Sequence, residues 1–195
     1  MTHRIVILGA GTGGTLTANR LRRKYRADEA SITVVDLDDT HVYQPGLLFV
    51  PFGLARGEDI VRPRARQLHR GIDVHLGAID RVDVAGDRVL LQDGTELGYD
   101  VLVVATGARL QPEDTEGLLG PAWNQSLFTF YDLAGATALH DALAGFSGGE
   151  LVVAVMDMPI KCPVAPLEFC FLADWYLTER KVRDRVHITY VTPLD

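Results

Sequence analysis

Residues 4–16 read Arg-Ile-Val-Ile-Leu-Gly-Ala-Gly-Thr-Gly-Gly-Thr-Leu, a short apolar run followed at once by closely spaced glycines. Apolar residues then recur at helical spacing as far as Tyr25, so this stretch predicts a strand, a tight turn and a helix. A second apolar run, Ile-Thr-Val-Val-Asp at 32–36, predicts a second strand. The first 36 residues therefore read as a βαβ unit, the beginning of a parallel α/β sheet.

The glycines of the turn follow the pattern G-x-G-x-x-G, with Gly9, Gly11 and Gly14 at its three fixed positions. Glycines at these positions permit the tight turn, the close approach of a pyrophosphate and the packing of the helix on the strand. Asp36 ends the second strand about 20 residues later, where a carboxylate can accept hydrogen bonds from ribose hydroxyls. We expect these four residues to bind a dinucleotide, and the pattern by itself does not distinguish NAD from FAD.

Residues 73–104 contain short apolar runs separated by the turn signals Gly86-Asp87 and Asp93-Gly94, a pattern that predicts a β-meander. The chain should return to the sheet through the apolar run at 101–104. Residues 111–126 hold Pro, Gly, Asp and Glu without periodicity and are the best candidate for a linker. We therefore predict one domain over 1–111, a Rossmann-like dinucleotide-binding unit with a β-meander, and a second domain over 112–195.

The second domain should be another βαβ unit. Helical patterns at 132–146 and 166–181 alternate with apolar strands at 151–156 and 187–191. Two strands are too few for an open α/β sheet, which usually has about 4–6. We expect an incomplete second Rossmann-like domain and a truncated chain.

Composition narrows the class of protein. The net charge of -7, with 47% hydrophobic and 23% charged residues, is typical of a soluble globular protein and argues against a nucleic-acid partner. The basic run of Arg62, Arg64, Arg66 and Arg70 is predicted to be a solvated face in preference to an anion site. No apolar stretch approaches the ~20 residues of a membrane span, no signal peptide is present, and the histidines lack metal-ligand spacing, so we expect a cytoplasmic protein without a metal.

The turn of the second βαβ unit carries a cysteine where a dinucleotide site would carry glycines. It reads Asp-Met-Pro-Ile-Lys-Cys-Pro-Val-Ala-Pro over 157–166, and its bulky and proline residues argue against NADH binding there. Pro166 suits a first helical turn, so Cys162 should lie just ahead of the helix. The positive end of the helix and the charge of the adjacent Lys161 would both favour a thiolate at Cys162. Cys162 is thus a candidate sulfur nucleophile, the alternative being a small buried residue at a turn. Cys170, in an apolar helical stretch, is expected to pack in the core.

The segment Tyr99-Asp-Val-Leu-Val-Val-Ala-Thr-Gly107 resembles the second signature of flavoproteins that bind two dinucleotides. That resemblance implies FAD in the first domain, with Thr106 and Gly107 near the cofactor. It also implies backbone contacts to the adenine from Gly77-Ala78-Ile79, centred on Ala78. An ordinary buried strand ended by glycine is the alternative.

Four stretches together carry a likeness to one family: the glycine-rich loop, His41-Val-Tyr-Gln-Pro-Gly-Leu-Leu-Phe-Val-Pro-Phe-Gly53, the Ala-Thr-Gly strand, and Lys161-Cys162 followed by Glu168-Phe169. With these the sequence resembles the N-terminal portion of the sulfide:quinone oxidoreductase family, FAD-dependent members of the pyridine nucleotide-disulfide oxidoreductase superfamily. The resemblance implies that Cys162 handles sulfide-derived sulfur, that Glu168 transfers protons, and that Tyr43 to Pro45 pass the flavin ring. Glu168 has an alternative role, because acids in a first helical turn complement the helix dipole.

The family pattern is not complete in this chain. A cysteine found between the domains of some members is absent from the stretch between Trp123 and Phe130. The resemblance places the partner cysteine, the third FAD signature and the quinone and membrane segments beyond Asp195. We therefore expect that this chain alone does not catalyse sulfide-dependent reduction of a quinone.

The function implied for the full-length protein is oxidation of sulfide through Cys162, with electrons passing through FAD to a quinone. Contact with a membrane surface would come only from segments beyond Asp195, and a homodimer is left open. One alternative is a related NADH or quinone flavoprotein in which Cys162 is not the sulfur carrier. The other is a non-catalytic FAD-binding fragment.

Overall fold

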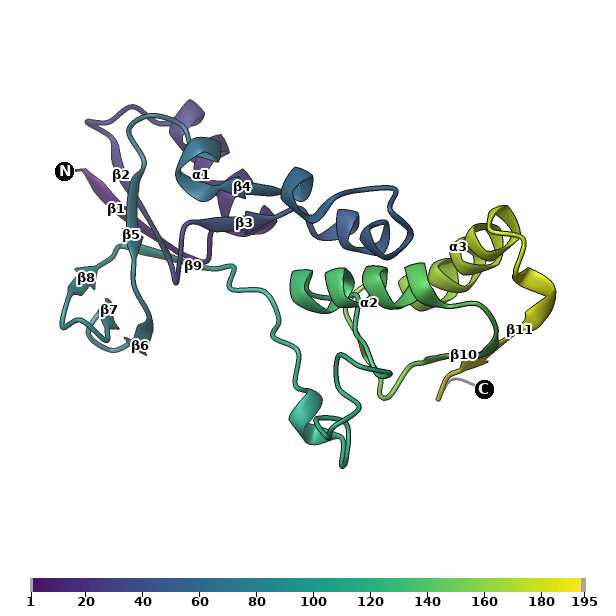
Figure 1. Ribbon diagram of the computed structural model, residues 1–195. Coiled ribbons are helices and arrows are strands. Elements are labelled where there is room, and N and C mark those ends of the chain that lie inside the picture. Colours follow the sequence, from purple (N-terminus) through teal and green to yellow (C-terminus); the bar gives the residue numbers. More distant parts are fainter. Residues whose placement is uncertain (1, 194–195) are drawn as a thin grey trace. The chain divides into compact units, whose positions relative to one another are not determined.

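In the computed structural model, which describes residues 2–193, the first apolar run forms a central strand of a parallel sheet (Figure 1). The strand order is β5 (Asp73–Leu76), β2 (Ala30–Asp36), β1 (His3–Leu8) and β9 (Val101–Val104). The helix α1 (Thr12–Lys24) joins β1 to β2, and all three strand pairs are parallel. The predicted βαβ unit and α/β class are confirmed.

The two faces of this sheet bury alternate residues of its strands, because successive side chains of a strand point to opposite faces. One face packs against α1, and the buried cluster between them includes Ile5, Ile7, Ile32 and Val34 of the strands and Ala18 of α1. The other face packs against the β-meander in a cluster that includes Val6, Leu8, Val35, Val89, Leu91 and Tyr99. Strands buried on both faces read as continuous apolar runs, which is how β1 and β2 appear in the sequence.

The meander is antiparallel and consists of β6 (Ile79–Asp83), β7 (Arg88–Leu91) and β8 (Glu96–Gly98). Its turns lie where the sequence predicted them, with Asp87 at φ 47° and Gly94 at φ 87°. The predicted start at Asp73 was wrong. Residues 73–76 pair parallel with β2 as the outer strand β5 of the main sheet, so the meander begins only at Ile79.

A short antiparallel ribbon, β3 (Thr40–Val42) with β4 (Val61–Pro63), follows β2. By packing, the chain divides into two compact units. The first contains the chain up to Val42 together with Val61–Ala108, and the second contains Tyr43–Ile60 together with the chain from Arg109 onward. The domain boundary at residue 112 stays a prediction.

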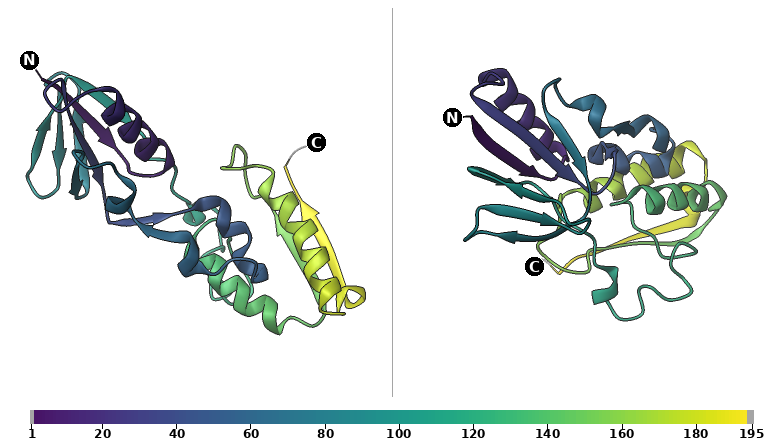
Figure 2. Two further views of the ribbon diagram at one scale, coloured as in Figure 1. Left: turned by 90° about the horizontal axis from the view of Figure 1, so that it is seen from above. Right: turned by 90° about the vertical axis from the view of Figure 1, so that its left-hand side faces the viewer.

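The second unit contains the second predicted βαβ motif. The helix α2 (Leu133–Gly145) precedes the strand β10 (Gly149–Ala154), which the helix α3 (Ala165–Glu179) connects to the strand β11 (Val186–Val191). β10 and β11 pair parallel, as the sequence predicted, and Figure 2 shows α3 running along them. No helix within residues 2–193 is long and apolar enough to cross a membrane.

Residues 43–60 form three short 3-10 helices in this unit: η1 (Gln44–Leu48), η2 (Val50–Phe52) and η3 (Gly57–Ile60). The ring of Phe52 lies 4.9 Å from that of Phe169 on α3, and the Phe52 side chain is buried. The core around them includes Leu139 and Leu143 of α2. This apolar packing makes an early segment of the chain part of the second unit.

Candidate functional site

The predicted dinucleotide site lies at the carboxyl edge of the parallel sheet, where β1, β2, β5 and β9 all end. Ligands of open α/β sheets bind at this edge because the loops that follow the strands meet there. All seven predicted cofactor-binding residues lie in or next to these loops: Gly9, Gly11, Gly14, Asp36, Ala78, Thr106 and Gly107. The first unit therefore brings together residues that are far apart in the sequence.

Backbone hydrogen bonds hold the loops in place beyond the ends of the strands. Gly9 N–H donates to the Val35 carbonyl at 2.7 Å, and Ala105 N–H donates to the Leu8 carbonyl at 2.8 Å. These bonds fix the glycine-rich loop against the β2 end on one side and the Ala-Thr-Gly turn on the other. Beyond that turn, Gly107 has a φ of 74°, a conformation that favours glycine.

Two glycines of the loop have different roles. A Cβ on Gly14 would overlap the carbonyl oxygen of Gly9, so glycine is required there for the helix to pack on the loop. A Cβ on Gly11 would meet no protein atom within 4 Å, so packing within the described chain does not require glycine there, and the open space agrees with the predicted approach of a pyrophosphate. Among residues 2–193, no side chain caps the N-terminus of α1, and its first turn has no acidic residue. The free N–H groups and the helix dipole thus suit an anionic diphosphate.

Asp36 is held at the end of β2 by three partners. Its carboxylate accepts hydrogen bonds from the N–H groups of Ala10 and Leu37, and its Oδ2 lies 3.2 Å from Nη1 of Arg64. Arg64 also donates to the Ala10 carbonyl at 3.0 Å, and its side chain is only 14% exposed. The predicted solvated face was therefore wrong for Arg64, because this guanidinium replaces its water contacts with a carboxylate and backbone carbonyls.

The other predicted cofactor contacts are backbone groups and an exposed hydroxyl. Ala78 directly follows β5 and is half-buried, and its carbonyl accepts a hydrogen bond from Gln92 N–H at 2.9 Å. That bond ties the Ala78 loop to the meander. Thr106 is exposed at the end of β9, where its side chain is accessible to a ligand.

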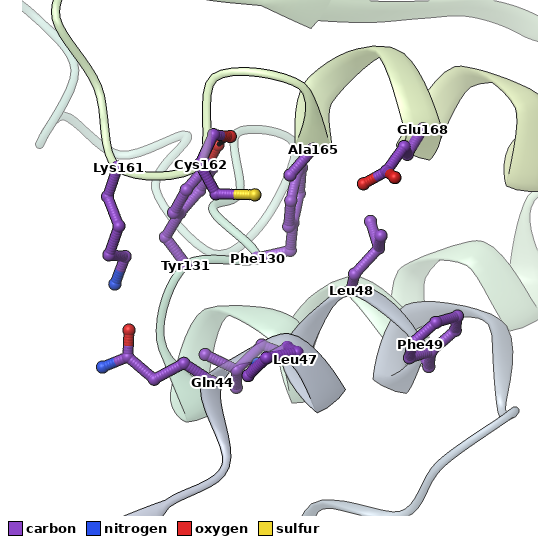
Figure 3. A pocket seen from close by; sticks show the side chains of 11 residues that line it. Gln44, Leu47, Leu48, Phe49, Phe130, Tyr131, Lys161, Cys162, Ala165 and Glu168 are labelled. Atoms are coloured by element: carbon purple, nitrogen blue, oxygen red, sulfur yellow. Dashed lines mark hydrogen bonds between the residues drawn. The ribbon is translucent and has the colours of Figure 1, made fainter. Parts of the chain in front are cut away.

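The second unit holds a cavity of about 410 Å³, lined mainly by apolar side chains (Figure 3). Its lining comes from three segments: residues within 44–49, Phe130 with Tyr131, and residues within 161–168. Both predicted catalytic residues, Cys162 and Glu168, line it. So do Gln44 and Pro45, from the segment that the family resemblance associates with the flavin ring.

Cys162 lies just ahead of α3, as predicted. The helix begins at Ala165 with Pro166 in its first turn, and Ala165 N–H donates to the Cys162 carbonyl at 3.1 Å. Cys162 is exposed, so the alternative of a buried turn cysteine is wrong. Its φ of 50° is uncommon for a residue with a side chain. In Figure 3 the sulfur atom points into the cavity.

Glu168 is exposed in the first turn of α3, where its carboxylate also complements the helix dipole. Cys170, one residue beyond Phe169, is half-buried and packs against the apolar core, as predicted. Burial raises the pKa of the Cys170 thiol, which disfavours its reactive thiolate. Within residues 2–193, no group of three or more acidic, histidine or cysteine side chains is placed to hold a metal ion.

Two polar residues of the cavity were not predicted as site residues, Tyr131 and Lys161. Burial, followed by the nearby Cys162, Tyr190 and Glu168, raises the pKa of Tyr131 to about 12. Burial lowers the pKa of Lys161. The signal that could have pointed to Tyr131 is its position directly before Asp132, the residue that caps α2.

Residues 3–153 match the pyridine nucleotide-disulphide oxidoreductase family. The chain belongs to this family. Its members are FAD-dependent oxidoreductases, which agrees with the glycine-rich loop and the Ala-Thr-Gly turn at the edge of the parallel sheet.

Known relatives include both sulfide and NADH oxidoreductases. The mitochondrial sulfide:quinone oxidoreductase of Dictyostelium discoideum is 27% identical over 96% of this chain and 41% of its own length. The Mus musculus protein of the same name is 24% identical over 98% of this chain and 42% of its own length. A type II NADH:quinone oxidoreductase of Mycobacterium tuberculosis is 34% identical over 55% of this chain and 23% of its own length. The sequence resemblance to sulfide:quinone oxidoreductases is confirmed, and the chain spans less than half the length of these relatives.

Solved structures show the same fold. The sulfide:quinone oxidoreductase of Aquifex aeolicus superposes with a TM-score of 0.78 at 22% identity, covering 98% of this chain and 43% of that one. NDH2 from Plasmodium falciparum, in complex with NADH, superposes with a TM-score of 0.68 at 13% identity, covering 97% and 41%.

Proposed function

We propose that this chain contributes the dinucleotide site and the sulfur-handling cysteine of an FAD-dependent oxidoreductase that oxidises sulfide and reduces a quinone. The observation that carries the proposal is the exposed thiol of Cys162 in an apolar cavity, on the loop where a second dinucleotide site would have glycines. Relatives named sulfide:quinone oxidoreductase match nearly the whole chain, and this supports the same assignment.

The first unit would hold FAD through the groups at the edge of its sheet. The N–H groups at the start of α1 would hold the pyrophosphate next to Gly11, and Asp36 would accept hydrogen bonds from the ribose. Backbone groups at Ala78 and the Thr106–Gly107 turn complete the site. Bound FAD would supply a two-electron acceptor.

The second unit would carry out the sulfur chemistry. Hydrosulfide attacks an oxidised sulfur on Cys162, forming a new S–S bond while the bond from Cys162 sulfur to a partner sulfur breaks. The partner leaves as a thiolate with the electron pair. Glu168, in the same cavity, takes up the proton that hydrosulfide releases. When the partner thiolate forms a bond to the outer sulfur of the persulfide, two electrons and a proton are released; bound FAD would accept the electrons and a quinone would reoxidise it. Because quinones dissolve in lipid, we place the full-length protein at a membrane surface.

Sulfide-dependent bleaching of the flavin absorbance tests this function in the full-length protein without oxygen. Cys162→Ser should retain its flavin and reduce it with sulfide about a hundredfold more slowly, because a serine hydroxyl cannot carry a persulfide. Cys170→Ser is the matched control and should bleach like the parent. Bleaching of Cys162→Ser at the parent's rate would refute the assignment of the sulfur chemistry to this cysteine.

A second candidate is an NADH:quinone oxidoreductase, which the 34% identity to the Mycobacterium tuberculosis enzyme favours. The loop at 157–166 argues against it, because proline and bulky side chains occupy the positions where NADH binding requires glycines. The two candidates differ in their electron donor. Rapid bleaching by NADH, with none by sulfide, would select the second one.

A further inference from the structure

Tyr131 contacts two neighbouring residues of the cysteine loop. Its phenol donates a hydrogen bond of 3.0 Å to the carbonyl oxygen of Cys162, and its ring centroid lies 5.6 Å from the ammonium nitrogen of Lys161. Tyr131 is itself anchored, because the next residue, Asp132, caps α2 by accepting a hydrogen bond of 2.7 Å from Gly135 N–H. A residue fixed at the start of one helix thus holds the loop that precedes another.

The hydrogen bond from Tyr131 supports an unfavourable backbone conformation. The φ of 50° at Cys162 is in the left-handed region, which costs free energy for a residue with a Cβ. Its carbonyl accepts from both Tyr131 and Ala165 N–H, so the loop is attached to the start of α2 and to the first turn of α3. The raised pKa of Tyr131, about 12, keeps the phenol protonated and able to donate.

The ring of Tyr131 contacts the Lys161 ammonium. Lys161 is half-buried, and the face of the Tyr131 ring and the nearby carboxylate of Asp132 are both favourable partners of its ammonium. Two carboxylates are near the same cavity. Asp132 is engaged in capping α2, and Figure 3 shows Glu168 at the opposite end from Lys161, with Cys162 between them.

We propose that Tyr131 is a positioning residue that holds the Lys161 ammonium in the cavity that Cys162 also lines, so that the cavity selects small sulfur anions over neutral thiols. This rests on the proposed function for its substrate, hydrosulfide. The apolar lining strengthens the effect, because a charge acts more strongly on an anion where water is partly excluded. Tyr131 would act through its two neighbours, without touching the reacting sulfur.

Alkylation of Cys162 measures the charge around its thiol without sulfide turnover. Iodoacetate carries a negative charge and iodoacetamide of similar size is neutral, and mass spectrometry of the peptide that contains Cys162 gives the rate for each. Lys161→Met and Tyr131→Leu should each lower the iodoacetate-to-iodoacetamide rate ratio by about threefold to tenfold. Tyr131→Phe keeps the ring and should keep the ratio. Lys181→Met, the same charge change beyond the other end of α3, is the matched control and should also keep it.

Hydrogen–deuterium exchange tests the role of the phenol. Tyr131→Phe should speed exchange in the peptide that covers the cysteine loop by about fivefold, the effect of one lost hydrogen bond. The unfolding midpoint of each variant identifies any that fail to fold, and Tyr131→Phe and Lys161→Met change the fewest contacts. An unchanged rate ratio in folded Tyr131→Leu, or unchanged exchange in Tyr131→Phe, would overturn the proposal. If the ratios change as expected but sulfide does not bleach the flavin, Tyr131 keeps its positioning role and the sulfide assignment fails.

Discussion

The guanidinium of Arg64 lies 3.2 Å from the carboxylate of Asp36, and both side chains are only 14% exposed. Arg64 follows the ribbon β3–β4 and Asp36 ends β2, so the pair joins two loops at the edge of the proposed dinucleotide site. The same guanidinium bonds the carbonyl of Ala10, inside the glycine-rich loop. Arg64 therefore fixes the position of the residue expected to bind the ribose.

Arg64→Met should weaken FAD binding by about 1–2 kcal/mol, because Asp36 and the glycine-rich loop lose a shared partner. The dissociation constant can be measured by titrating the apoprotein with FAD and following flavin fluorescence. Arg66→Met removes an exposed arginine of the same turn and should bind like the parent. Equal affinity of both variants would show that Arg64 has no role in binding.

Asp36→Ala should weaken FAD binding by about 1–3 kcal/mol through the loss of charge-assisted ribose contacts. The same titration measures it. Combined with Arg64→Met, it forms a double-mutant cycle in which the two effects should be less than additive, because the residues are in contact. A dissociation constant that Asp36→Ala leaves unchanged would exclude a ribose contact.

Gly11→Val should abolish FAD binding while the apoprotein remains folded, because the new side chain meets open space in the protein and fills the space of the pyrophosphate. Gly14→Ala should lower the unfolding temperature, because its Cβ would overlap the Gly9 carbonyl. Flavin content after purification and thermal unfolding separate the two effects. Full flavin content in Gly11→Val would contradict the proposed binding at this loop.

Acid should weaken the contact between the start of β1 and the residue before β9. Asp100 accepts hydrogen bonds from the guanidinium of Arg4 and then from its backbone N–H, and these lower the pKa of Asp100 from 3.8 to about 2. A carboxylate whose pKa is lowered by folding contributes its full stabilisation when the pH is above the ordinary pKa. That contribution is lost as the pH falls from about 4 to about 2. The urea midpoint of Asp100→Asn should therefore fall less with pH across this window than that of the parent. Asp80→Asn, at an exposed carboxylate of β6, should keep the parent's dependence.

Phe52→Ala should destabilise the second unit by about 3–5 kcal/mol, because it removes a buried ring from between α2 and α3. Both tryptophans, Trp123 and Trp175, lie in this unit, so tryptophan fluorescence in urea reports its unfolding. Leu54→Ala is the control, because Leu54 is 51% exposed in the same segment. Equal midpoints for the two variants would show that the segment does not stabilise the second unit.

The strands and helices were largely predictable because each depends on a local pattern. Continuous apolar runs indicated β1, β2 and β9, and helical spacing indicated α2 and α3 to within a few residues. The glycine-rich turn follows from the same local reasoning, since a tight turn between strand and helix needs residues without side chains. The exception is β5, whose place in the main sheet depends on pairing with β2, a partner distant in sequence.

The sequence by itself determined which residues could carry chemistry: the glycines, Asp36, Cys162 and Glu168. Only the tertiary structure decided which residues assist them. Arg64 resembles any arginine of a basic run until folding brings it to Asp36, and Tyr131 is an ordinary aromatic residue until its phenol reaches Cys162. The physical reason is that a hydrogen bond or an ion pair depends on distances between segments remote in the chain, and packing sets those distances after each segment has taken its local form.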